Sequence, residues 1–136
     1  MINVRYDHAT KRRDERGFLV DFLKGDELSP RYQRLGQIYF VTFDTPRVVR
    51  GNHYHKTKNE WFVVVLGKVK LVAENEKTKE RREYILDGDH DKYERVFIGK
   101  HVAHAFQNIS KTAMMLNYAD KSYHDESPDT TPYKLL

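Results

Sequence analysis

The sequence predicts an all-β protein, built as a sandwich or barrel of short strands. Runs rich in β-branched and aromatic residues recur along the chain, and turn residues such as Gly, Pro, Asn and Asp separate them. In one run Val69, Leu71 and Ala73 share a face, while Lys68 and Lys70 fall on the other. Helix is expected to be minor. The expected strands cover residues 18–22, 37–43, 60–66, 68–73, 83–86, 95–98 and 113–118.

Two segments predict features beyond the strands themselves. Residues 61–66 are apolar on both faces, which is expected where one face meets the core and the other meets a second sheet or a partner subunit. This pattern favours a homodimer. The tail, residues 120–136, contains Ser127-Pro128-Asp129 and Thr131-Pro132, and proline-containing sequences of this kind predict an extended C-terminal arm.

Length and composition indicate one domain in a reducing compartment. The 136 residues are 39% hydrophobic, enough for one core, so residues 1–136 are expected to form a single domain with an N-terminal strand segment. Cysteine is absent, and a transition metal would therefore be bound by imidazole and carboxylate. Residues 1–13 lack an apolar signal-peptide core and the longest apolar run is too short to span a bilayer. We expect a cytoplasmic protein without a membrane partner.

The charge of the chain favours a small anionic ligand over nucleic acid. The formal net charge is +4, but residues 74–83 and similar segments intersperse both signs, whereas a nucleic-acid surface clusters its cations. No nucleic-acid partner is expected.

Three histidines and one glutamate are the candidate functional residues of the sequence. His53 and His55 are two residues apart, so on a strand both imidazoles point to one face. Glu60 begins the next strand, where a short connection returns its carboxylate to the same space. His104 opens a later β segment and Asn108 follows it. Each histidine alone is more often a partly buried polar residue than a ligand. Together they predict a site for one divalent metal ion, with zinc favoured.

The joint spacing resembles both conserved motifs of the cupin superfamily. His-x-His, four residues, Glu, six residues and Gly form the first motif, and a distant His-x-x-x-Asn forms the second. The resemblance implies a cupin fold, which is a jelly-roll or double-stranded β-helix barrel. Cupins usually carry Pro-x-Gly where this chain has Gly99-Lys100-His101, so His101 is a candidate for the pocket wall.

The flanking residues are similar to those of narrower families. Asp14-Glu15-Arg16-Gly17 and Arg50-Gly51-Asn52-His53 resemble the D-x-R-G and R-G-x-H segments of nucleotide-sugar 3,5-epimerases and 3,4-ketoisomerases. Residues 52–60 and Pro128-Asp129-Thr130 are similar to the cupin domain of bifunctional capsular-polysaccharide enzymes. The resemblance implies an isomerase that acts on a dTDP- or UDP-linked 4-keto-6-deoxyhexose, through an enolate formed by proton abstraction at C3, and in some members at C5, in surface polysaccharide biosynthesis.

The resemblance also implies roles for individual residues. The epimerase comparison makes His53 the base and Tyr118 the acid, whereas the ketoisomerase comparison divides the proton transfers between His53 and His55, with Tyr39 nearby. The residues that it implies for substrate binding are Arg16, Arg50, Tyr123 and His101.

The sequence leaves two roles open for His53. A histidine whose lone pair is on a metal ion cannot take a proton from carbon, so His53 is either a ligand or a base. The lysine that the epimerases carry after R-G-x-H has no counterpart in Glu60-Trp61-Phe62. The alternatives to an epimerase are a 3,4-ketoisomerase, a metal-dependent cupin of another class such as a dioxygenase, and a non-catalytic sugar-binding cupin.

Overall fold

The computed structural model describes every residue except 1, 33–34, 91 and 125, and its regular structure is almost entirely strand. The helical part of the described residues is two short 3-10 turns, η1 (Gly25–Glu27) and η2 (Pro30–Tyr32), and neither is long or apolar enough to cross a membrane. The prediction of an all-β chain is confirmed. The strands are β1 (Val4–Ala9), β2 (Lys11–Asp14), β3 (Gly17–Val20), β4 (Gln37–Phe43), β5 (Val49–Tyr54), β6 (Glu60–Leu66), β7 (Lys68–Asn75), β8 (Arg81–Asp87), β9 (Tyr93–Ile98), β10 (Val102–Asn108), β11 (Ala113–Ala119) and β12 (Thr131–Pro132).

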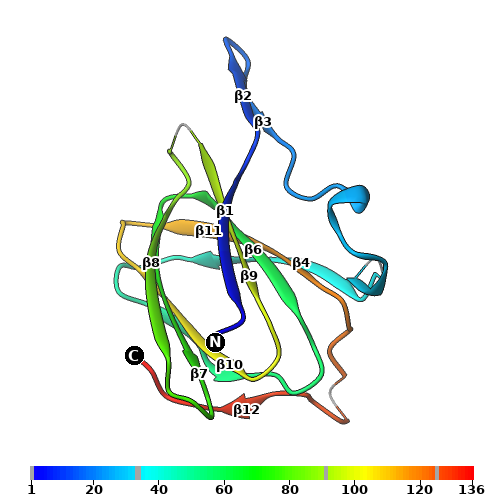
Figure 1. Cartoon of the computed structure of the whole chain (residues 1–136). Helices are drawn as coiled ribbons and strands as arrows, with labels where there is room; N and C mark the ends of the chain where they lie inside the picture. The colour runs from blue at the N-terminus through cyan, green and yellow to red at the C-terminus, as the bar shows by residue number, and fades with distance from the viewer. Residues whose placement is uncertain (1, 33–34, 91, 125) are drawn as a thin grey trace.

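Two antiparallel five-stranded sheets face each other and form a barrel (Figure 1). The first sheet has the order β1-β9-β6-β11-β4 and is called the β6 sheet below. The second has the order β12-β5-β10-β7-β8 and is called the β10 sheet. Phe62 of β6 packs against Phe106 of β10 with ring centroids 4.8 Å apart, and Leu71 and Val64 belong to the same core between the sheets. Strands β2 and β3 pair only with each other and project beyond the barrel (Figure 1).

Strand β6 is apolar on both faces because both faces are covered. Phe62 and Val64 point into the core, so the alternation of a strand directs Trp61 and Val63 outward. Trp61 packs there with Phe97 and Tyr118, under residues 22–28 of the connection that follows β3. The sequence predicted a second sheet or a partner subunit on this face, whereas the chain covers it with its own N-terminal connection.

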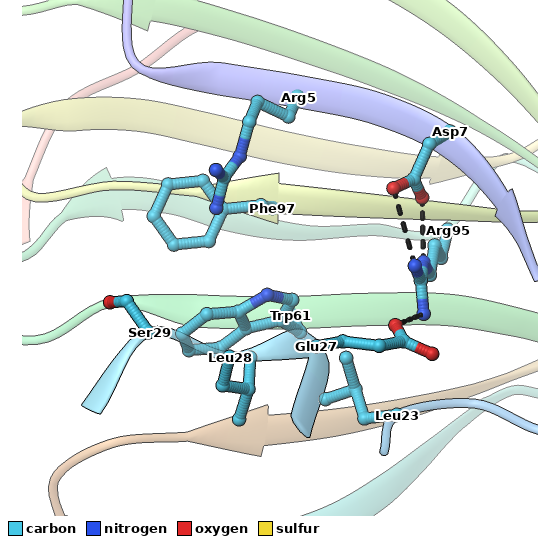
Figure 2. A pocket seen from close by; sticks show the side chains of 9 residues that line it. All are labelled: Arg5, Asp7, Leu23, Glu27, Leu28, Ser29, Trp61, Arg95 and Phe97. Carbon is cyan, nitrogen blue, oxygen red and sulfur yellow. Dashed lines mark hydrogen bonds and ion pairs between the residues drawn. The ribbon is translucent and has the colours of Figure 1, made fainter. Parts of the chain in front are cut away.

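An ion-pair network fixes that connection on the outer face of the β6 sheet. Arg95 of β9 pairs with Asp7 of β1 and with Glu27 of η1, each with an N–O distance of 2.6 Å. Figure 2 shows these groups beside Trp61 and Phe97, with the Arg5 guanidinium lying over the Phe97 ring. The ion pairs are largely solvent-exposed on the acidic side, so they position the connection more than they stabilise it.

A β-bulge in strand β5 decides which side chains enter the barrel. His53 pairs with His104 of β10, but Ala105 pairs with Gly51, so Asn52 has no partner in the ladder. Both Gly51 and Asn52 have positive φ, 95° and 56°. The shift places Arg50 opposite Phe106, and cross-strand partners share a face. Arg50 therefore lies on the inner side with His53, although residues three apart on a regular strand point to opposite sides.

Gly51 is required at the bulge for two reasons. Its φ of 95° lies in a region that side chains with a Cβ rarely adopt. A Cβ at this position would also lie 2.7 Å from the backbone oxygen of His104. The Arg-Gly-Asn-His sequence is thus a structural device that turns an arginine and a histidine to the same side.

The C-terminal arm lies along β5. In β12, Thr131 pairs with Tyr54 and Pro132 with His53. The side-chain oxygen of Asn52 accepts hydrogen bonds from the backbone N–H groups of Leu135 and Leu136, at 2.8 and 3.1 Å. The bulge residue therefore anchors the arm.

Candidate metal centre and active site

Three histidines meet inside the barrel, next to the bulge. His53 and His104 are cross-strand neighbours on β5 and β10, and His55 lies directly after β5. One ring nitrogen of each lies within 4.8 Å of the other two. His55 and His104 are buried, whereas His53 is half-buried and is the imidazole that solvent reaches most easily. The structure thus brings together the three histidines that the sequence predicted.

Two of the imidazoles are oriented by backbone carbonyls. His104 Nδ1 lies 3.0 Å from the oxygen of Val102, and His55 Nδ1 lies 2.5 Å from the oxygen of Asp129 in the C-terminal arm. A carbonyl oxygen only accepts, so each Nδ1 carries the hydrogen and donates it. Each Nε2 is then free to present its lone pair to the centre of the cluster. This is the outer-shell arrangement typical of histidines that bind metal ions.

Glu60 reaches the cluster from the facing sheet. Its Oε2 accepts a hydrogen bond from Asn117 Nδ2 at 3.2 Å and one from the Tyr39 hydroxyl at 3.4 Å. Its Oε1 lies 2.8 Å from His55 Nε2 and 3.6 Å from His104 Nε2. Despite these short distances, this buried oxygen makes no well-directed hydrogen bond within the described part of the chain. A carboxylate oxygen beside two imidazole lone pairs is unfavourable unless a positive charge lies between them.

The donor set therefore fits a divalent cation. Three imidazole nitrogens and one carboxylate oxygen are ligands that suit Zn²⁺, Fe²⁺, Mn²⁺ or Ni²⁺. The three histidines form the tight cluster, and Glu60 adjoins it through contacts with His55 and His104.

The electrostatics of the site hold these groups in the protonation states that ligands need. Burial raises the pKa of Glu60, but the contact with His55 and the charges of His104 and His55 outweigh burial and lower the pKa to about 2. Burial, followed by the electrostatic effect of the neighbouring His104 and His55, lowers the pKa of His53 to about 3. Near neutral pH, Glu60 is ionised and His53 is neutral. A pKa this low also makes His53 a weak base in the absence of a metal ion, because a general base works best near the operating pH.

Tyr39 and Arg50 are the other predicted residues that the structure places at the site. Burial and the negative charge of Glu60 raise the pKa of Tyr39, so its hydroxyl stays protonated. The guanidinium of Arg50 lies over the ring of Phe43 at 5.7 Å, and its Nε donates to the oxygen of Thr42 at 3.1 Å. The bulge at Asn52 is what brings this exposed cation to the rim of the barrel.

Tyr118 is not at the histidines, contrary to the prediction that it is the acid. Asn117 points inward to Glu60, so its neighbour on β11 points outward. The Tyr118 ring packs on Trp61 with centroids 5.3 Å apart, on the outer face of the β6 sheet. The β6 sheet therefore lies between the Tyr118 ring and the three histidines.

His101 and Arg16 also lie away from the three histidines. The prediction that they bind substrate beside the histidines of the same chain is therefore wrong. His101, with a positive φ of 62°, turns its ring outward to Glu76, 3.2 Å away. Arg16 pairs with Asp14 at the tip of the β2–β3 hairpin, and its side chain is 83% exposed. The hairpin projects from the top of Figure 1, whereas β12, which pairs with His53, runs along the bottom.

Three polar residues near the site were not predicted. Asn117 could have been found, because alternation on β11 places either it or Tyr118 inside. Asp129 orients His55 from 74 residues away, and no local pattern shows that contact. Lys58 is a buried residue of the loop that joins His55 to Glu60, and it lines a cavity that is also lined by the predicted residue Tyr123.

A barrel of two antiparallel sheets with a His-x-His pair, a facing glutamate and a third histidine defines a cupin. The chain matches the family model of the polysaccharide biosynthesis C-terminal domain over residues 12–131, and it belongs to this family. It is 31% identical over 118 residues to UDP-2-acetamido-2,6-beta-L-arabino-hexul-4-ose reductase of Pseudomonas aeruginosa. That match covers 86% of this chain and 29% of the reductase.

Solved structures show the same barrel. The capsular polysaccharide assembling protein CapF of Staphylococcus aureus is 27% identical with a TM-score of 0.69, over 93% of this chain and 34% of CapF. A dTDP-6-deoxy-D-glucose-3,5-epimerase of Legionella pneumophila is 25% identical with a TM-score of 0.76, over 91% of this chain and 70% of that enzyme. A 3,4-ketoisomerase of Helicobacter canadensis is 21% identical with a TM-score of 0.78, over 96% of this chain and 91% of that enzyme. The predicted cupin fold is confirmed.

Proposed function

We propose that this chain is an isomerase of a nucleotide-linked 4-keto-6-deoxyhexose that serves surface polysaccharide biosynthesis, inverting C3, or C3 and C5. The observation that carries the proposal is the cluster of His53, His55 and His104 with Glu60, inside a barrel whose relatives include a 3,5-epimerase and a capsular polysaccharide protein. A C4 ketone acidifies the neighbouring C–H bonds, so a base that takes the proton from one face of the carbon, followed by return of a proton to the opposite face of the enolate, inverts that carbon.

We further propose that these four residues hold one divalent metal ion, with Zn²⁺ favoured. The buried Glu60 Oε1, without a well-directed hydrogen bond in the described part of the chain, supports this assignment, as do the two imidazoles oriented through Nδ1. A bound ion of this kind polarises a carbonyl oxygen as a Lewis acid.

The chain supplies two further groups, one for charge stabilisation and one for substrate binding. The Tyr39 hydroxyl, kept protonated by burial and by Glu60, can donate a hydrogen bond to the oxygen on which enolate charge develops. Arg50 stands at the rim, where its guanidinium can hold an anionic part of the substrate. His53 serves as a ligand in this arrangement, since its low pKa makes it a poor base.

Deuterium exchange tests the proposal. The chain is incubated in D₂O with dTDP- and UDP-linked 4-keto-6-deoxyhexoses, and loss of the C3 and C5 proton signals is followed by ¹H NMR. Exchange with inversion supports an epimerase. Exchange with a product whose ketone has moved to C3 makes the chain a 3,4-ketoisomerase. Oxygen consumption with bound iron would indicate a dioxygenase, and binding without any exchange would indicate a sugar-binding cupin.

We also propose that the chain is a homodimer that pairs through β4. This strand is the last in the β6 sheet, and its outward side chains Ile38 and Phe40 are 61% and 68% exposed. An edge strand with an apolar outer side suits pairing with a second copy about a two-fold axis. Light scattering should give twice the chain mass for the wild type and a monomer for Phe40→Glu. A monomeric wild type would refute this part.

A further inference from the structure

Lys58 is a buried cation whose charge interacts electrostatically with Glu60. Its residue is 7% exposed, and it makes no hydrogen bond or ion pair with any other residue that the structure describes. Its neighbour Asn59 shows the contrast, because the backbone N–H and side-chain amide of Asn59 both donate to Asp120, at 2.8 and 2.9 Å. An ammonium group removed from water without a hydrogen-bonded counterion is unfavourable, and a ligand that supplies such a counterion would relieve this cost.

The side chain lines a cavity in which both described carboxylates already accept hydrogen bonds from the chain. The cavity has a volume of ≈ 320 Å³ and also contains Lys121 and Tyr123. Both acidic residues at its wall are engaged. Asp120 accepts from Asn59, and the Asp129 carboxylate accepts from the backbone N–H groups of residues 56 and 57 at 2.9 Å each. The wall therefore carries two lysines and two carboxylates. The carboxylates already accept hydrogen bonds from the chain, whereas no described residue forms a hydrogen bond or ion pair with either lysine side chain.

The cavity adjoins the histidine cluster. Asp129 belongs to its wall, and the backbone oxygen of the same residue accepts the hydrogen bond from His55 Nδ1. The charge of Lys58 also contributes to the lowered pKa values of His53 and Glu60, as expected for an ammonium group nearby. A ligand held by Lys58 would thus extend toward the site where the ketone reacts.

We propose that Lys58, assisted by Lys121, binds the diphosphate group of the nucleotide-linked sugar. This inference rests on the proposed function for the identity of the substrate. A diphosphate carries enough negative charge to compensate both lysines, and a cavity of ≈ 320 Å³ is at the small end of ligand sites. It has room for the diphosphate but not for the whole nucleotide sugar, which places the sugar on one side and the nucleoside on the other.

Calorimetry with matched variants tests the assignment. Lys58→Met removes the buried charge while keeping the length of the side chain, and Lys56→Met removes an exposed charge from the same loop. Inorganic pyrophosphate, UDP, dTDP and uridine are titrated into each protein. Lys58→Met should weaken pyrophosphate and UDP about 10- to 100-fold, as expected for a lost charged hydrogen bond, and Lys56→Met about 3-fold at most. Uridine should bind weakly and equally to all three.

Thermal unfolding of the free proteins separates ligand binding from a structural role. Since Lys58→Met removes an unpaired buried charge, the ligand-free variant should unfold at the wild-type temperature or higher, and it should lose the stabilisation that pyrophosphate gives. Equal weakening by both variants, or unchanged pyrophosphate affinity in Lys58→Met, would overturn the proposal. Pyrophosphate that binds as tightly as UDP would overturn the assignment to a nucleotide. Pyrophosphate binding needs no turnover, so the site is tested even if deuterium exchange fails.

Discussion

Gly51→Ala is the substitution whose effect the structure determines most closely. The new methyl group would lie 2.7 Å from the His104 oxygen and 3.3 Å from the Ala105 Cα, and both are backbone atoms of a central strand. A left-handed backbone costs a residue with a Cβ roughly 1–2 kcal/mol, and overpacking a rigid site typically costs about 1–3 kcal/mol. The free energy of unfolding should therefore fall by about 2–5 kcal/mol.

Two other glycines separate these contributions. Gly17 has a φ of 129° with no atom within 4 Å of the added Cβ, and Gly25 has open space and no positive φ. Gly17→Ala should cost only the backbone part, roughly 1–2 kcal/mol, and Gly25→Ala less than about 1 kcal/mol. Urea unfolding measures all three, with an unchanged m-value as the check that the denatured state is unaffected. If Gly51→Ala costs no more than Gly17→Ala, the close approach of β10 does not constrain the bulge.

Three further predictions concern the site. Glu60→Gln should weaken zinc binding by at least about 100-fold, because even supporting residues of a metal site are worth about 10- to 100-fold, and competition with a chromogenic chelator measures it. The pKa of His53 is lowered to about 3 in the folded chain, so the unfolded chain binds the proton at a higher pH than the folded chain does. Chelator-treated protein should therefore lose stability as the pH falls from 6.5 toward 3. Urea titrations at each pH measure this dependence, and His53→Asn should flatten it. Asp129→Ala removes three hydrogen bonds to the loop after His55 and should cost about 1–3 kcal/mol, more than Thr57→Val, which removes one of them; equal costs would contradict this role of the carboxylate.

The fold and the histidine cluster could be predicted from spacing that is local in sequence. His53 and His55 are two apart on one strand, and Glu60 begins the next, so the alternation of a strand and a short loop suffice to bring them together. His104 was found because the second motif repeats a known spacing. Strands β1 and β2 were missed because residues 4–14 carry few apolar side chains and lack the alternation that marks a half-buried strand.

The errors came from features that depend on register and on distant contacts. Tyr118 was favoured over Asn117 because the sequence shows a strand but not which of its faces points inward. The bulge at Asn52 reverses the face of Arg50, and only the pairing with β10 reveals it. In the sequence Lys58 resembles a surface lysine, and only the structure shows that it is buried. The single domain, the cytoplasmic location and the identity of the metal ion stay predictions.

The central claim is that the histidine cluster with a bound metal ion enolises a nucleotide-linked 4-keto sugar. It is tested most directly by measuring deuterium incorporation at C3 with chelator-treated protein, the same protein reloaded with Zn²⁺, and reloaded Glu60→Gln. The account predicts exchange in the reloaded wild type only. Equal exchange in chelator-treated and reloaded wild type would contradict it and would make His53 a metal-free base, and no exchange in any sample would remove the isomerase itself.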